Sequence, residues 1–143
     1  MPARFHEQEV KSKLSQKRKL SLFLDELVGQ HRLQVKRIQL TYIFCSDEAL
    51  LEMNQQFLDH DTFTDIITFD LSEKETELIG EIYISVDRIA ENAQKFNTDY
   101  QQELHRVIFH GALHLCGFKD KTKKDAAAMR LQEDHCLKAW AIT

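Results

Sequence analysis

The change of hydrophobic period along the chain constrains its fold most tightly. Residues 36–45 alternate with a period of two and are rich in β-branched and aromatic side chains, which predicts a strand. Runs at 65–71 and 78–85 alternate in the same way, and the polar stretch between them predicts a hairpin. Apolar residues recur every three or four positions over 15–30, over 47–57 and from 85 onward, which predicts helices. This order of elements predicts an α+β fold, and residues 3–6 carry only a faint strand pattern.

Capping residues divide the helical C-terminal half into three helices. Ser85 is expected to cap the first, Thr98 and Gln101 to form a capping box for the second, and Thr122 to cap the third. The second helix has one apolar face to bury and leaves Arg106, His110 and His114 on a neighbouring face.

Length and composition indicate one domain over residues 1–143. The chain is 43% hydrophobic and 29% charged, and one proline and four glycines leave no flexible linker. It has no apolar signal segment at the N-terminus and no run of about 18 apolar residues, so we expect a cytoplasmic protein without a membrane segment. Three cysteines without a C-x-x-C pair fit reduced, packed thiols better than disulfides.

Charge is unevenly distributed, although the net charge is only −4. Eleven acidic residues and one basic residue lie between positions 47 and 81, whereas residues 11–19 hold five basic residues and no acid. A second basic group comprises Lys119, Lys121, Lys123 and Lys124. Each basic group is either a solvated helix surface or a device that steers a phosphate backbone.

Two histidines four residues apart indicate a metal site. His110 and His114 fall on one face of a helix, so both rings can bind one cation. Gly117 allows the helix to end in a left-handed cap, and the turn that follows can return Asp120 to the same point. Two imidazoles and a carboxylate, with the fourth position open to water, are typical of catalytic zinc. We therefore predict one Zn²⁺ held by His110, His114 and Asp120.

Other ligands and another metal remain open at this stage. His135 on the last helix, or His60 in a loop, can replace or supplement Asp120, which by itself can also be a turn or capping residue. Two histidines and a carboxylate also suit the iron(II) of oxygenases. A helix-borne histidine pair followed by a glycine turn is the pattern of zinc hydrolases, so zinc is favoured.

The spacing of these residues matches the metzincin zinc peptidases, H-E-x-x-H-x-x-G-x-x-H, with aspartate in the last position. The peptidase mechanism needs the glutamate directly after the first histidine as its general base. This chain has Gly111 there, which has no side chain. A metzincin-like metalloprotease is therefore kept only as an alternative.

With Gly111 included, the stretch from His110 to Asp120 resembles the YbeY family of bacterial endoribonucleases, whose motif is H-G-x-L-H-L-x-G-aromatic-D-H. Two further blocks carry the resemblance. Residues 54–61 and 64–69 are similar to the family segment N-x-x-aromatic-R-x-x-D-x-P-T-D-V-L-S-F, and residues 80–82 are similar to its G-D-I element. The three blocks follow one another in the family order.

The resemblance implies a fold of helices around a four-stranded sheet. Together with the element pattern, this predicts a small mixed sheet of about four strands packed with about five helices. The resemblance also implies a metal-dependent, single-strand-specific endoribonuclease that acts in ribosomal RNA maturation and ribosome quality control, with zinc as the usual metal. The implied partners are single-stranded RNA, ribosomal RNA and the small ribosomal subunit.

Two departures from the family motifs bear on activity. Asp120 takes the place of the family's third histidine, and a carboxylate can still bind the metal. Leu58 takes the place of the family's arginine, a natural stabiliser of phosphate charge. Lys119, Lys121 or Arg106 is expected to substitute for it. Without a substitute, the chain is expected to be a non-catalytic ribosome-assembly factor with a metal site.

The resemblance and the motif together assign roles to individual residues. His110 and His114 are expected to be catalytic, because they hold the ion whose bound water reaches a pKa of about 7. His60 is expected to act as an acid or a base. Substrate binding is assigned to Thr64, Asp65, Arg106, Lys119 and Lys121.

Overall fold

The computed structural model describes residues 2–58 and 64–143, and within these residues the chain forms four strands and five helices. In chain order they are β1 (Ala3–Glu7), α1 (Lys17–His31), β2 (Arg37–Cys45), α2 (Asp47–Leu58), β3 (Ile66–Asp70), β4 (Glu77–Ser85), α3 (Val86–Lys95), α4 (Tyr100–Leu115) and α5 (Lys123–Ala141). The predicted α+β fold, with its small mixed sheet, is confirmed.

The four strands form one sheet in the order β1-β2-β4-β3. β1, β2 and β4 run parallel, with Leu40 opposite both Ala3 and Gly80. β3 is antiparallel to β4, with Ile66 opposite Ile84, so the predicted hairpin is confirmed. Parallel neighbours need long crossover connections, and α1 and α2 lie within the two connections here.

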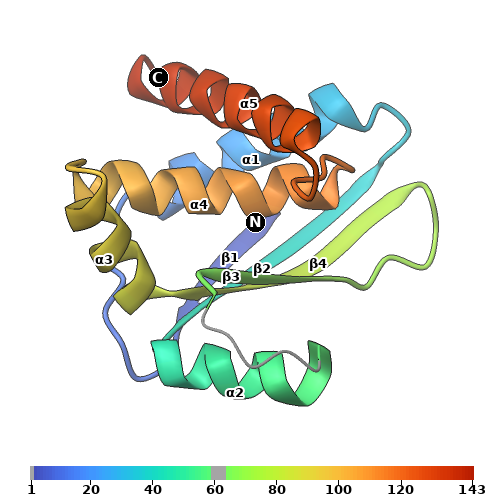
Figure 1. The fold of residues 1–143 in the computed structure, drawn as a ribbon. Helices are drawn as coiled ribbons and strands as arrows, with labels where there is room; N and C mark the ends of the chain where they lie inside the picture. Colours follow the sequence, from blue (N-terminus) through green and yellow to red (C-terminus); the bar gives the residue numbers. More distant parts are fainter. Residues whose placement is uncertain (1, 59–63) are drawn as a thin grey trace.

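The helices lie unequally on the two faces of the sheet (Figure 1). α1, α4 and α5 are on one face, and α2 is on the other. The main core lies beneath α4, where fully buried side chains of the sheet and helices pack together, among them Leu24, Tyr42, Ile82 and Ile108. The buried Tyr42 hydroxyl donates to the Ile108 carbonyl at 2.8 Å, so this polar group costs little and ties β2 to α4.

Close packing of α4 on the sheet depends on Gly111. A Cβ atom at this position would lie 2.9 Å from Ile82 Cγ2 and 3.0 Å from Ile66 Cδ1. Gly111 therefore faces β3 and β4 and lets the helix backbone approach them. Position 111 points into the core, so a general base could not act there.

Most predicted boundaries lie within two residues of the observed ones, and Ser85 and Thr122 cap α3 and α5 as predicted. The prediction that Thr98 and Gln101 form a capping box for α4 is wrong. The N-cap of α4 is Asp99, whose side chain makes no capping bond, and the Thr98 hydroxyl donates to Glu103 Oε1 at 2.9 Å. None of the helices in residues 2–58 and 64–143 has the length and apolar character needed to cross a bilayer.

Candidate metal centre

The C-terminal cap of α4 positions one of the two motif histidines. Gly117 has a φ of +111°, its N–H bonds to the His114 carbonyl, and the Phe118 N–H bonds to the Leu113 carbonyl, both at 3.1 Å. This pair of bonds is a Schellman motif, which favours glycine at the residue with positive φ. The turn brings the Phe118 carbonyl 3.0 Å from His114 Nδ1. Since a carbonyl only accepts, Nδ1 is the donor, and Nε2 of the neutral ring keeps its lone pair.

His110 lies between two carboxylates. Its Nδ1 is 2.7 Å from Glu133 Oε2, and its Nε2 is 3.3 Å from Asp120 Oδ2. The turn after α4 therefore does return Asp120 to the first histidine. The His110 and His114 rings are nearly parallel, with 6.3 Å between centroids and 6° between planes.

The contact between His110 and Asp120 tests whether these residues suit a metal ion. Because Nδ1–H is donated to Glu133, a neutral His110 ring presents the lone pair of Nε2 to Asp120 Oδ2, which is also an acceptor. Two acceptors at 3.3 Å need a proton or a metal ion between them. Two donors of a tetrahedral zinc ion, each about 2.0–2.1 Å from it, stand about 3.3–3.4 Å apart, so this pair fits.

The three predicted metal ligands do not all lie as close together as His110 and Asp120. Within residues 2–58 and 64–143, no three His, Cys, Asp or Glu side chains gather into a group that could hold a metal ion. His110 and Asp120 are adjacent, and His114 lies one helical turn further along α4. The types of donor suit zinc, and each histidine has its Nδ1 engaged, so Nε2 is the nitrogen that would bind the ion.

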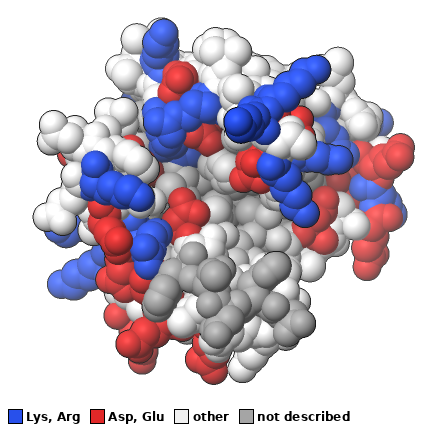
Figure 2. All heavy atoms as spheres, viewed as in Figure 1, with Lys and Arg blue, Asp and Glu red and all other residues white. Residues whose placement is uncertain are grey.

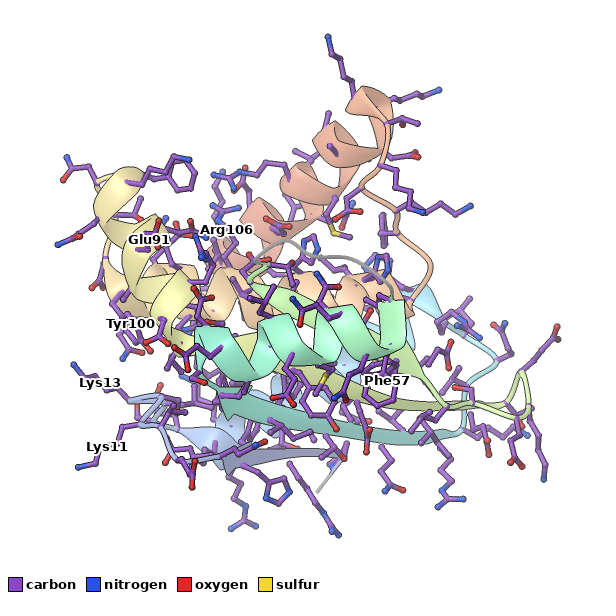
Figure 3. The ribbon with its side chains drawn as sticks, turned by 60° about the horizontal axis from the view of Figure 1, so that its bottom comes forward. Lys11, Lys13, Phe57, Glu91, Tyr100 and Arg106 are labelled. Atoms are coloured by element: carbon purple, nitrogen blue, oxygen red, sulfur yellow. The ribbon has the colours of Figure 1, made fainter. Side chains whose placement is uncertain are left out.

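Arg106 precedes His110 by one helical turn and lies where α4 meets α5 (Figure 3). Its Nη1 is 3.0 Å from Glu133 Oε1, and its Nη2 is 2.9 Å from Asp134 Oδ1. The sequence assigns Arg106 to substrate, whereas here both terminal nitrogens bond to carboxylates. Arg106 therefore holds the carboxylate that bonds to His110.

Glu133 is the site residue that the sequence analysis missed. It is 5% exposed and stands on the buried face of α5, between the core residues Met129 and Cys136. Acidic residues are almost never fully buried unless they are paired. An acid that interrupts the apolar stripe of an amphipathic helix was therefore the available signal.

The electrostatics of the cleft raise two pKa values. Burial by itself lowers the pKa of His110, but the hydrogen bond that His110 donates to Glu133 and the negative charges of Glu133, Asp120 and Asp65 outweigh burial and raise it. For the carboxyl group of Asp65, burial acts in the other direction and is the main cause that raises the pKa. The positive charge of His110 opposes this rise. In the metal-free protein both groups thus hold protons to higher pH than usual.

These groups line a cleft of about 330 Å³ between α3, α4 and α5. Its charged and titratable lining comprises Asp65, Glu103, Arg106, His110, Asp120, Arg130 and Glu133. Figure 2 shows Lys and Arg side chains gathered over α5 and the connection leading into it, with carboxylates among them. Among the described residues, the cleft lining thus holds four carboxylates and two arginines.

Lys119 and Lys121 are exposed in the turn between α4 and α5, and the Thr64 hydroxyl donates to the Ile66 carbonyl at 3.3 Å. His60 lies outside the described residues. His135 lines a different, larger hollow of about 500 Å³ between α1 and α5, so it does not join His110.

Comparison with known proteins decides the family. The model of the family described as Endoribonuclease YbeY matches residues 4–141. The chain belongs to the YbeY family. Endoribonuclease YbeY of Cytophaga hutchinsonii is 45% identical over 133 residues, covering 93% of this chain and 92% of that protein. Endoribonuclease YbeY of Porphyromonas gingivalis is 54% identical over 99 residues, covering 69% of this chain and 65% of that protein.

Among solved structures, the solution structure of TM1509 from Thermotoga maritima is similar, with a TM-score of 0.56 and 27% identity. The match covers 97% of this chain and 91% of that one. YbeY membership supports an endoribonuclease role for this chain, and the resemblance read from the three sequence blocks is confirmed at the level of the family.

Proposed function

We propose that this YbeY-family chain is a zinc-dependent endoribonuclease that cuts single-stranded RNA and acts in ribosomal RNA maturation and ribosome quality control in the cytoplasm. The family supports the endoribonuclease role. The observation that carries the metal dependence is the 3.3 Å separation of His110 Nε2 and Asp120 Oδ2 in the cleft, which fits two donors of one zinc ion.

His110, His114 and Asp120 would hold the zinc ion, and Asp120 would serve in the place of the family's third histidine. When bound, the ion supplies a water whose pKa falls toward about 7. Asp65 lines the same cleft, and its raised pKa suits a group that exchanges a proton near the reacting phosphodiester. Glu133 fixes the direction of the His110 ring.

The cation that neutralises the phosphate charge of RNA has to come from another residue, because Leu58 stands where the family has arginine. Leu58 ends α2 and its apolar side chain cannot neutralise an anion. Arg106 is paired with Glu133 and Asp134, which leaves Lys119 and Lys121 from the sequence-based set. The structure adds Arg130, which lines the cleft with its side chain 61% exposed and 3.9 Å from Glu133.

Leucine at position 58, where the family has arginine, favours a second function. If no other cation replaces that arginine, the chain would bind ribosomal RNA and the small ribosomal subunit as an assembly factor without cutting RNA. A metalloprotease gains no such support, since position 111 faces Ile82 and Ile66 in the core.

Cleavage of labelled single-stranded and double-stranded RNA tests the proposal. We expect cutting of the single strand only, with loss of activity on chelation, recovery with Zn²⁺, and loss in His114→Ala. His135→Ala is the matched control, because His135 is a histidine outside the cleft, and it should cut normally. If the zinc-loaded protein binds RNA without cutting it, this result would instead support the assembly factor. Cutting that survives chelation would contradict the proposed metal dependence.

A further inference from the structure

The two histidines of the motif are oriented by different means. His114 Nδ1 bonds to the backbone carbonyl of Phe118, at 3.0 Å, which any residue at position 118 would supply. His110 Nδ1 bonds to the side chain of Glu133 on another helix, at 2.7 Å. Only the orientation of His110 therefore depends on side chains that a single substitution can remove.

The carboxylate of Glu133 is itself fixed on both oxygens. Oε2 accepts from His110, and Oε1 accepts from Arg106 at 3.0 Å. Arg106 is in turn tied to Asp134 at 2.9 Å. The side chains of Arg106 and Glu133 are only 9% and 7% exposed, so water does not compete strongly for these bonds.

A buried carboxylate needs this arrangement. An isolated charge in the interior is costly, and a paired arginine offsets the cost because its planar fork holds a carboxylate in one geometry. Arg106 reaches Glu133 from the position one turn before His110 on the same helix. Two residues of α4 thus hold the Glu133 carboxylate: Arg106 on one oxygen and His110 on the other.

We infer that Asp134, Arg106 and Glu133 form a positioning network that holds His110 in the tautomer protonated on Nδ1, with its Nε2 lone pair directed at Asp120. The network acts through His110, because Glu133 bonds to the His110 ring and Arg106 and Asp134 hold Glu133 in place. Carboxylates that accept from a metal-binding histidine usually change metal affinity about 10- to 100-fold when they are mutated. The expected change in metal affinity rests on the proposed function, but the prediction of the His110 tautomer does not.

The test is long-range ¹H–¹⁵N NMR of the histidine rings in the metal-free protein, at a pH where both rings are neutral. Wild type should show His110 and His114 protonated on Nδ1 only. Glu133→Gln should shift the His110 ring to protonation on Nε2 and leave His114 unchanged. Arg106 only donates and so holds the amide oxygen, which leaves the amide NH₂ to donate to Nδ1. The matched control is Arg130→Gln, which removes the more exposed and more distant cation near the same carboxylate, 3.9 Å away, and should change neither ring.

A wild-type His110 ring protonated on Nε2 would overturn the inference without any variant, so the test survives a Glu133→Gln protein that fails to fold. An unchanged His110 pattern in Glu133→Gln, or an equal effect of Arg130→Gln, would also overturn it. Titration with Zn²⁺ then separates the two proposals. We expect binding about 10- to 100-fold weaker in Glu133→Gln than in wild type. No Zn²⁺ binding by wild type, with the tautomers as stated, would contradict the proposed function and leave the network standing.

Discussion

Replacing Gly117 with alanine should destabilise the protein through the backbone alone. Its φ of +111° lies in the region that residues with a Cβ rarely adopt. A Cβ atom there would meet nothing within 4 Å, so no steric clash adds to the cost. Holding alanine in such a conformation costs about 1–3 kcal/mol. For a domain of 143 residues this lowers the melting temperature by about 3–10 °C.

Gly29→Ala is the matched control, because it makes the same chemical change in an exposed part of α1 where a Cβ also meets nothing within 4 Å. Gly29 has no positive φ, and alanine is the better helix former by about 0.5–1 kcal/mol. Thermal melts of the metal-free proteins should therefore move in opposite directions. A Gly117→Ala protein as stable as wild type would refute the role given to this turn.

Two further predictions concern titratable groups. Burial raises the pKa of Cys45, Cys116 and Cys136 to about 11 each, so all three free thiols should react with a thiol reagent at pH 8 far more slowly in the folded protein than after unfolding, and one fast thiol would contradict the packing. The raised pKa of Asp65 means that its contribution to stability is present below its unfolded pKa and is lost as the pH rises through its folded pKa. Asp65→Asn should therefore raise the melting temperature of the metal-free protein at pH 7 and have no such effect below about pH 4, whereas a lower melting temperature at pH 7 would count against a buried carboxylate.

Local patterns were sufficient for most of the secondary structure. The alternation over 36–45 and the Gly117 cap are signals carried by neighbouring residues, and both are found where they were predicted. β1 was only faintly indicated, because a five-residue edge strand owes its formation to parallel pairing with β2, more than 30 residues away. The sheet order depends on the same long-range pairing.

The candidate site shows the same division between local and distant information. The spacing of His110, His114 and Asp120 follows from one helix and one turn, and the structure brings Asp120 to His110. Glu133 reaches His110 from a separate helix, 23 residues on, and no local pattern encodes that contact. The partners of Arg106 on α5 are equally distant in sequence, so its ion pairs could not be predicted either.

X-ray absorption spectroscopy of the zinc-loaded protein reports the ligands of the ion directly. We predict one ion per chain with nitrogen and oxygen donors at about 2.0–2.2 Å, two of them imidazoles, and no sulfur. A sulfur donor at about 2.3 Å, a single imidazole, or less than one tightly bound ion per chain would contradict a centre built from His110, His114 and Asp120.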